Sequence, residues 1–234
     1  MGIALSRRPS SMADGAPKLL IIGGSGLVGR ALLGGLADGT AANIHALLRR
    51  PMDVSPSIET HLVDPQSWPS AIAAIAPEIL LCALGTTIKA AGSQSAFYAV
   101  DFELLVASAR AAHKAGARQI IFVSSVGANA TSRGFYLRTK GEGEAAVEAL
   151  GFDRVDIMRP GLLLGARQGA LRVGERIGMA LAPLTNALTP SAFDQFHGIH
   201  SEDVARAMIA LIGAENGGNH VHHNREMLAL ARSE

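Results

Sequence analysis

The sequence has little of several residue classes, and each shortage excludes something. Its 234 residues include a single cysteine, Cys82, so no intramolecular disulfide can form. This fits a reducing compartment, and we expect a cytoplasmic protein. No apolar run approaches the about 18 residues that a membrane-spanning helix needs, so no transmembrane segment is expected. The formal net charge of +1 provides no general attraction for nucleic acid, so no nucleic-acid partner is expected either.

What remains is a globular composition. Hydrophobic residues make up 48% of the chain, charged residues 18% and aromatic residues 4%, which describes an Ala/Leu/Gly-rich folded protein. The length suits one domain, and we expect it over residues 17–234. Residues 1–16 carry Arg7, Arg8 and several serines without apolar periodicity, and we expect a disordered leader. A tag or extended start, an organelle presequence and an N-myristoylation signal remain alternatives for it.

A glycine-rich loop follows the first apolar run. Residues 19–22 read as a strand and residues 30–33 as the body of a helix, with Gly23-Gly24-Ser25-Gly26-Leu27-Val28-Gly29 between them. In this context Gly23 allows a tight turn, Gly26 lets the backbone approach a pyrophosphate, and Gly29 lets the helix pack closely on the strand. The first N–H groups of the helix would point at the phosphates. The alternative is a purely structural turn between strand and helix.

Two arginines end the second predicted strand, residues 44–50. An acidic residue at this place bonds the ribose 2′-hydroxyl of NAD, whereas arginine accommodates the 2′-phosphate of NADP. No acid is present, and Arg49 and Arg50 could pair with a phosphate bidentately, so NADP(H) is the predicted cofactor. The alternative is a solvated basic turn before Pro51.

Strands and helices alternate along most of the chain. Further strands are expected over residues 58–63, 78–84, 119–123 and 155–158, with a last edge strand over 220–224. Helices are expected over 66–75, over 93–115, from a Thr131 or Ser132 cap to 150, and from a Ser201 cap to 211. This alternation predicts an α/β fold with a Rossmann-type doubly wound parallel sheet. A small C-terminal substrate-side extension would use residues 162–200 and 213–234.

An acid/base pair is predicted on the helix after the fifth strand. Tyr136 and Lys140 are four residues apart and share a helix face. A nearby ammonium favours the phenolate, so such a pair can donate or accept a proton nearer neutrality. Alone, the spacing would more often be accidental. The glycine loop and the strand pattern favour the functional reading.

Four ordered motifs carry a family resemblance. They are Gly23-x-x-Gly26-x-x-Gly29, Val123-Ser124-Ser125, Tyr136-x-x-x-Lys140 and Arg159-Pro160-Gly161. Together they resemble the short-chain dehydrogenase/reductase (SDR) superfamily. Gly85-Thr86-Thr87, Ser124-Ser125-x-Gly127-Ala128 and Tyr136-Leu137-x-x-Lys140-Gly141-Glu142 are similar to its atypical branch, which contains the HIV Tat-interacting oxidoreductase-like proteins. The likeness spans residues 18 to about 212.

The resemblance implies a role for each matching residue. Tyr136 would be the proton donor or acceptor, Lys140 would favour its phenolate and bond the nicotinamide ribose, and Ser125 would orient the substrate carbonyl, with Ser124 as the alternate. The residues implied in cofactor binding are Gly23, Ser25, Gly26, Leu27, Val28, Gly29, Arg49, Arg50, Leu84, Gly85, Tyr136, Lys140 and Leu163. One departure follows: Asp101 lies where many conventional members keep a catalytic asparagine, which puts a complete proton relay in doubt.

The predicted function is an NADP(H)-dependent oxidoreductase acting on a small carbonyl or alcohol. An NADPH-binding regulatory or assembly protein with little turnover is the first alternative. A sugar-nucleotide epimerase or dehydratase is the second, although the short gap from Ser125 to Tyr136 argues against it. The helices over 93–115 and 132–150 resemble those that pair subunits in the superfamily, which leaves a homodimer open. His220, His222 and His223 do not share one strand face, and no metal site is predicted.

Overall fold

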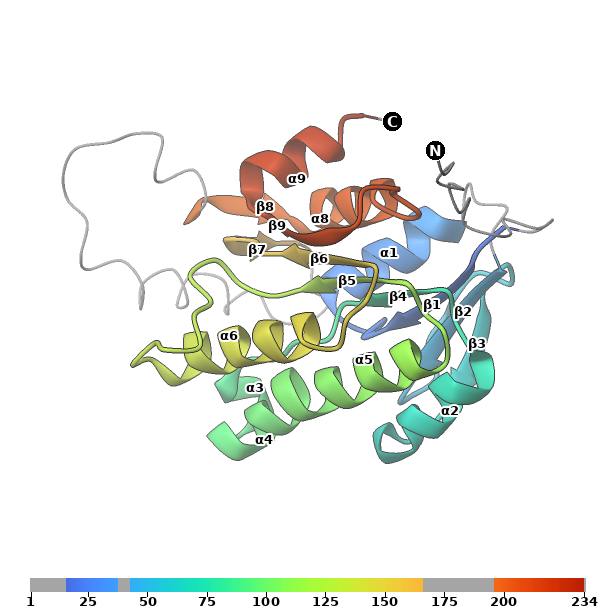
Figure 1. Ribbon diagram of the computed structural model, residues 1–234, viewed down its shortest axis with the longest axis horizontal. Helices are drawn as coiled ribbons and strands as arrows, with labels where there is room; N and C mark the ends of the chain where they lie inside the picture. The colour runs from blue at the N-terminus through green and yellow to red at the C-terminus, as the bar shows by residue number, and fades with distance from the viewer. Residues whose placement is uncertain (1–15, 38–42, 166–195, 234) are drawn as a thin grey trace, which may run out of the picture.

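A computed structural model of the chain describes residues 16–37, 43–165 and 196–233 (Figure 1). These residues form a seven-stranded sheet in the order β3-β2-β1-β4-β5-β6-β9, in which every neighbouring pair is parallel. Its strands are β1 (Lys18–Ile22), β2 (Asn43–Leu48), β3 (Glu59–Leu62), β4 (Ile79–Cys82), β5 (Gln119–Val123), β6 (Arg154–Met158) and β9 (Gly218–His222). The predicted doubly wound α/β fold is confirmed. The predicted leader and the substrate-side residues 166–195 lie outside the described residues, apart from Ala16.

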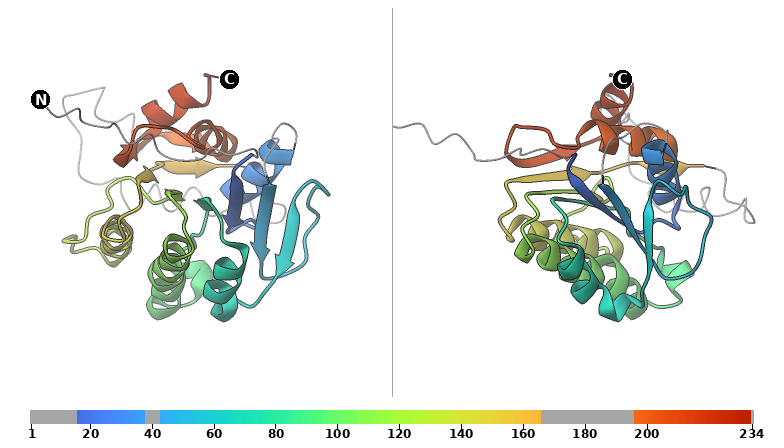
Figure 2. Two further views of the ribbon diagram at one scale, coloured as in Figure 1. Left: turned by 45° about the vertical axis from the view of Figure 1, so that its right-hand side comes forward. Right: turned by 90° about the vertical axis from the view of Figure 1, so that its right-hand side faces the viewer.

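Helices cover both faces of the sheet because its central strands are apolar on both sides (Figures 1 and 2). In β1, Leu19 and Ile21 pack into one core and Leu20 and Ile22 into the other. Such continuous apolar runs are typical of buried parallel strands. The first core is closed by α1 (Leu27–Ala37), α8 (Ser201–Ala210) and α9 (Asn224–Leu230), and the second by α2 (Trp68–Ile75), α5 (Leu105–Lys114) and α6 (Phe135–Glu148).

The strand order reverses at β1, which pairs with β2 on one side and β4 on the other. Chain connections leave these strands toward opposite faces, so a crevice opens at their carboxyl ends. Ligands of open α/β sheets bind at such a point, and the glycine loop follows β1 there.

The helix predicted over residues 93–115 is divided in the structure. It consists of α4 (Gln94–Tyr98), a π-helical segment (Ala99–Leu104) and α5, and a short helix α3 (Ile88–Ala91) precedes it. A π-helical turn widens the helix locally and is often found at functional sites. Here the segment carries Asp101, whose side chain is buried.

Both predicted helix caps are wrong. The helix α6 begins at Phe135, after an extended Gly134, because the Ser132 hydroxyl accepts a hydrogen bond from the Gly134 N–H and helps to form a turn instead. The helix α8 already includes Ser201, whose hydroxyl donates to Glu202, and His200 occupies the cap position. Short polar side chains stabilise turns as readily as helix ends, so their position in sequence does not decide between the two.

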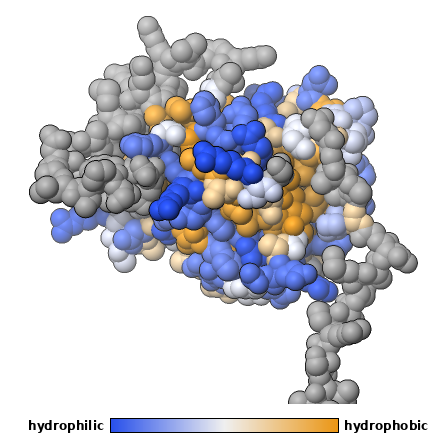
Figure 3. Space-filling model, turned by 90° about the horizontal axis from the view of Figure 1, so that it is seen from above, coloured by the Kyte–Doolittle hydropathy of each residue, from blue (hydrophilic) through white to orange (hydrophobic). Residues whose placement is uncertain are grey.

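A separate two-stranded parallel sheet was not predicted. It pairs β7 (Leu162–Leu164) with β8 (Gly198–His200), on either side of residues 166–195. Leu164, at the end of β7, is 37% exposed, and Phe196, which precedes β8, is 47% exposed. Figure 3 shows the layer of α8 and α9 from above, with hydrophobic surface between hydrophilic groups.

None of the helices in the described part of the chain has the length and apolarity to span a membrane.

The carboxyl-terminal histidines have structural partners. The strand β9 lies beside β6, and His222 Nε2 lies 2.9 Å from the buried Asp156 Oδ1. Arg154 donates to both oxygens of Asp156, at 2.7 and 2.8 Å, and Gln119 donates at 2.9 Å. His223 caps α9. This network attaches β9 to the sheet and gives His222 a hydrogen-bond partner in Asp156.

Candidate active site

The glycine loop has the close contacts that its sequence predicts. Gly23 has a positive φ of 84°, and a Cβ added there would lie 2.4 Å from the Ala83 carbonyl carbon. A Cβ on Gly29 would lie 2.2 Å from the Gly23 carbonyl oxygen. Both positions therefore require glycine for the fold alone. Gly26 differs, because the nearest atom that a Cβ there would meet, the Gly23 carbonyl oxygen, lies 3.5 Å away at an ordinary van der Waals distance, so the fold alone does not require glycine at this position.

The loop after β1 touches the end of β4, and the end of β4 touches the lysine of the Tyr-Lys motif. The Cβ position of Gly23 lies 2.6 Å from the Leu84 nitrogen. One residue further on, the Cβ position of Gly85 lies 3.7 Å from Lys140 Nζ and 3.8 Å from Asp101 Oδ1. The fold thus brings the predicted phosphate loop, Leu84, Gly85 and Lys140 to one edge of the sheet.

Lys140 forms a buried ion pair that the sequence analysis missed. Its Nζ lies 2.7 Å from Asp101 Oδ1, and the two side chains are 7% and 0% exposed. The other carboxylate oxygen of Asp101 accepts a hydrogen bond of 3.0 Å from the Thr86 N–H. Burial by itself would lower the pKa of Lys140, but the Asp101 carboxylate, helped by Tyr136, raises that pKa above its ordinary value. Lys140 is therefore an ammonium at neutral pH.

Glycines on α6 set the position of the Tyr-Lys helix. A Cβ on Gly141 would lie 2.2 Å from the Ala130 nitrogen, so the helix rests directly on the loop after β5. The Cβ position of Gly143 lies 3.3 Å from Leu105 Cδ2 on the neighbouring helix α5. Tyr136, one turn before Lys140, is half-buried with its ring centroid 5.4 Å from that of Phe97. Both glycines therefore let other parts of the protein approach the helix closely.

The serine motif lies along the Arg-Pro-Gly motif. The Ser124 N–H donates to the Met158 carbonyl at 2.7 Å, and the Val126 N–H donates to the Pro160 carbonyl at 3.0 Å. Both serine side chains are buried. The Ser125 hydroxyl makes a long bond of 3.3 Å to the Val126 carbonyl, whereas the Ser124 hydroxyl has no hydrogen-bond partner among the described residues. Among the described residues, no hydrogen bond joins the hydroxyl of either serine to Tyr136.

The remaining predicted residues lie around the same edge with fewer contacts. Arg49 and Arg50 directly follow β2, are exposed, and form no ion pair with another described residue. Leu163 lies in β7, and the Cβ position of Gly165 at the end of that strand is 3.3 Å from Leu27 Cδ2. The half-buried Leu163 is thereby placed near the start of α1.

A second ion pair was also missed. Arg159 Nε donates to Glu144 Oε1 at 2.9 Å and joins the end of β6 to α6. Glu144 follows Lys140 by four residues, so it lies on the same helix face. The sequence therefore offered one signal for Glu144: an acid on the same helix face as the predicted site lysine. For Asp101 the signal was an acid, one of two together with Glu103, inside the otherwise mainly apolar stretch from Phe97 to Leu105.

Comparison with known proteins gives independent evidence on the family and the fold. Residues 19–224 match the model of the family described as "NAD dependent epimerase/dehydratase family". Among solved structures, the UDP-Glc/GlcNAc 4-epimerase from Campylobacter jejuni has a TM-score of 0.66 at 14% identity, over 92% of this chain and 82% of that one. An SDR superfamily protein from Agrobacterium tumefaciens, with bound NAD, has a TM-score of 0.65 at 17% identity, over 88% and 77%. At these identities the likeness shows the fold.

Curated relatives are more similar in sequence. "Protein FMP52, mitochondrial" of Eremothecium gossypii is 32% identical over 92% of this chain and 97% of its own length. Its namesake in Debaryomyces hansenii is 35% identical over 82% and 85%. The expectation of a cytoplasmic protein is wrong in the light of these relatives, which are named mitochondrial. The single cysteine misled us because a reducing environment does not distinguish one intracellular compartment from another.

Proposed function

Since the chain belongs to the NAD dependent epimerase/dehydratase family, in the SDR superfamily, we propose that it is an oxidoreductase that uses NADP(H) on a small carbonyl or alcohol. The FMP52 relatives fit the atypical branch of the superfamily. The proposal rests on one observation: Gly85 lies close to Lys140 and Asp101. Gly85 follows β4, whose end packs against the glycine loop, so this contact brings the loop and the Tyr-Lys helix to one place.

The loop fits a dinucleotide. A pyrophosphate would approach the backbone at Gly26, where the fold alone does not require glycine, and the start of α1 provides N–H groups that no helical carbonyl accepts. Leu84, Gly85 and Leu163 would contact the rest of the cofactor. When bound, the dinucleotide supplies or accepts hydride. The protein residues hold the reactants and move the proton.

In this proposal Tyr136 gives its phenolic proton to the carbonyl oxygen during reduction and takes it back in the reverse direction. Lys140 provides a fixed positive charge beside it, and Ser125 donates a hydrogen bond that orients the carbonyl. Ser124 is the alternate for that role, since its hydroxyl has no partner among the described residues. Such proton transfer contributes about 10²–10⁴-fold to a rate.

Tyr136→Phe tests the chemistry, and the only other tyrosine, Tyr98, provides a matched control. We expect Tyr136→Phe to bind NADPH normally and to oxidise it about 10²–10⁴-fold more slowly in single turnovers with aldehydes, ketones and quinones. Tyr98→Phe should retain the wild-type rate. Wild-type activity that survives Tyr136→Phe would remove Tyr136 from the mechanism.

The cofactor preference has its own test. Calorimetric titration should show NADPH binding more tightly than NADH by about 1–3 kcal/mol, the value of charge-assisted hydrogen bonds to the 2′-phosphate. Replacing Arg49 and Arg50 by alanine should remove most of that difference. Arg110→Ala, at another exposed arginine, is the control. Equal affinities of the wild type for both cofactors would contradict the proposal.

A regulatory role is the second candidate, and the Asp101–Lys140 pair favours it. The carboxylate cancels the charge of Lys140 2.7 Å away, which weakens its support for a phenolate. NADPH that binds tightly but is not oxidised by any carbonyl would support this candidate. UDP-glucose and UDP-glucuronic acid belong in the same panel, because conversion of either would instead indicate a sugar-nucleotide epimerase.

Two further properties are proposals. A mitochondrial location follows from the names of the curated relatives, and it would be contradicted by fractionation in which the full chain follows only cytosolic markers. The second is a homodimer in which α5 and α6 pair with the same helices of a second copy, as the corresponding helices pair subunits in the superfamily. Light scattering that gives only the 24.3 kDa chain at micromolar concentration would exclude a stable dimer.

A further inference from the structure

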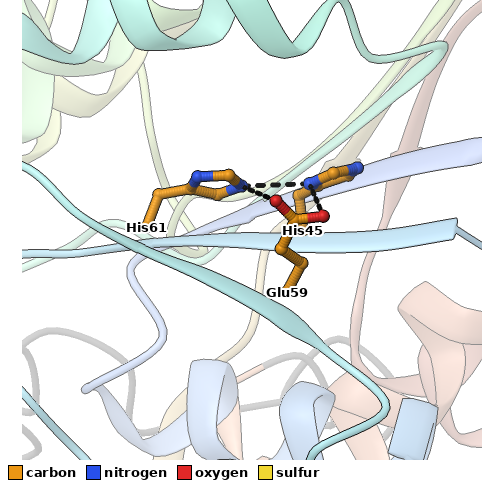
Figure 4. A group of neighbouring side chains, drawn as sticks. All are labelled: His45, Glu59 and His61. Atoms are coloured by element: carbon orange, nitrogen blue, oxygen red, sulfur yellow. Dashed lines mark hydrogen bonds and ion pairs between the residues drawn. The ribbon is translucent and has the colours of Figure 1, made fainter.

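A group of three ionisable side chains that the proposed function does not use lies on β2 and β3. His45 comes from β2, and Glu59 and His61 come from the edge strand β3 (Figure 4). The register pairs His45 with Glu59, and His61 follows Glu59 by two residues. Because side chains alternate along a strand, all three stand on one face. Figure 4 shows the two rings and the carboxylate converging.

The separations between their ligand atoms fit a metal ion better than hydrogen bonds. His45 Nδ1 lies 3.0 Å from His61 Nε2 and 3.5 Å from Glu59 Oε2, and His61 Nε2 lies 3.6 Å from Glu59 Oε1. A tetrahedral Zn²⁺ with bonds of about 2.0–2.1 Å separates its ligand atoms by about 3.3–3.4 Å. The two N···O distances are long for hydrogen bonds. Only the contact between the imidazoles is short enough to be one.

The exposure of the group also suits a hydrated cation. The side chains of His45, His61 and Glu59 are 10%, 27% and 63% exposed. A hydrated ion can therefore reach the group from the side of Glu59 and keep water as a further ligand.

From this geometry we propose that His45, Glu59 and His61 form a binding site for a divalent transition-metal ion of the zinc class, which links β3 to β2. The edge strand gains most from such a link, because it has only four residues and pairs with the sheet on one side. Two imidazoles and one carboxylate are a recurrent zinc ligand set. His45 Nε2 has no hydrogen-bond partner among the described residues, so we expect weaker binding than at sites whose histidines are held by outer partners.

The test uses the untagged full chain, stripped with EDTA and titrated with ZnCl₂ against a chromophoric chelator. The wild type should bind about one equivalent, and Co²⁺ in its place should give the visible absorption of a tetrahedral site. Glu59→Gln and His61→Gln should each weaken binding at least about tenfold, the lower limit for losing an outer partner. Zn²⁺ should raise the melting temperature of the wild type and not of either variant. Both positions are on the edge strand, so circular dichroism should show both variants folded.

The chain offers a matched control in His220, a histidine on the opposite edge strand β9. His220→Gln should bind Zn²⁺ as the wild type does. Loss of binding in this variant would move the site to the carboxyl-terminal histidines and overturn the proposal. Absence of saturable binding by the wild type, or unchanged affinity in Glu59→Gln and His61→Gln, would leave the group as a hydrogen-bonded histidine pair and would equally overturn it.

Discussion

Replacing Asp101 by asparagine is the sharpest test of the buried ion pair. The substitution keeps the shape of the side chain and an oxygen for the Thr86 N–H, but it removes the negative charge 2.7 Å from Lys140 Nζ. The ammonium is then left buried without a counter-charge. Removing one partner of such a pair typically costs about 3–5 kcal/mol in free energy of unfolding. Because the amide still accepts hydrogen bonds, we expect a loss of about 3 kcal/mol at pH 7.

The pH dependence of this loss identifies Lys140 as its cause. In the wild type the folded-state pKa of Lys140 is raised above the ordinary value of 10.5, so its stabilising contribution is fully present below pH 10.5 and is lost at higher pH. In Asp101→Asn the effect of burial is unopposed, and the pKa of Lys140 should fall below 10.5. The penalty is then greatest at neutral pH and is relieved as the pH rises toward 10.5. The two proteins should therefore converge in stability with rising pH.

Urea denaturation followed by circular dichroism, at pH 7, 9 and 10.5, measures this difference. Glu103→Gln is the matched control, since it removes an exposed carboxylate from the same π-helical segment. It should change the free energy of unfolding by less than about 0.5 kcal/mol at each pH. An Asp101→Asn protein as stable as the control at pH 7, or a deficit that does not change with pH, would refute the reasoning.

Three further outcomes are expected. Gly141→Ala should destabilise the protein because its Cβ would lie 2.2 Å from the Ala130 nitrogen, whereas Gly34→Ala, with open space around it in α1, should stabilise it by up to about 1 kcal/mol in thermal unfolding. Gly26→Ala should keep the wild-type melting temperature, because its Cβ would meet the Gly23 and Ala83 carbonyl oxygens only at ordinary van der Waals distances of 3.5 and 3.8 Å. It should nevertheless weaken NADPH binding in calorimetry, since a pyrophosphate that approaches the backbone there would meet the new methyl group. Burial raises the pKa of the Cys82 thiol to about 12, so the folded protein should not react with a disulfide reagent at pH 8, and rapid reaction would show that the site opens.

The features that the sequence predicted correctly are those that depend on local interactions. The positive φ of Gly23 and the close packing of Gly29 on Gly23 are local to one strand-loop-helix unit, and the structure reproduces them. The contact of Gly23 with Ala83 is tertiary and was not predicted. Tyr136 and Lys140 share a helix, so their spacing was readable from the sequence. The parallel sheet followed from apolar runs that alternate with helices.

The tertiary partners could not be read in this way. Asp101 meets Lys140 only because a π-helical turn and the packing of α6 bring distant segments together. The caps failed because Ser132 and Ser201 had equally good local partners in other conformations. His45 and His61 lie on different strands, and only the register between β2 and β3 makes them neighbours.

The position of β9 also has a consequence for the way the chain folds during synthesis. The strand pairs with β6, yet all of residues 159–217 must be translated before it can do so. At about 5–20 residues per second this leaves β6 as an open sheet edge for on the order of 3–12 s. Its free backbone groups can meanwhile recruit another extended segment. We therefore expect nascent chains stalled before residue 218 to aggregate or to be held by chaperones, whereas chains released after β9 should resist proteolysis.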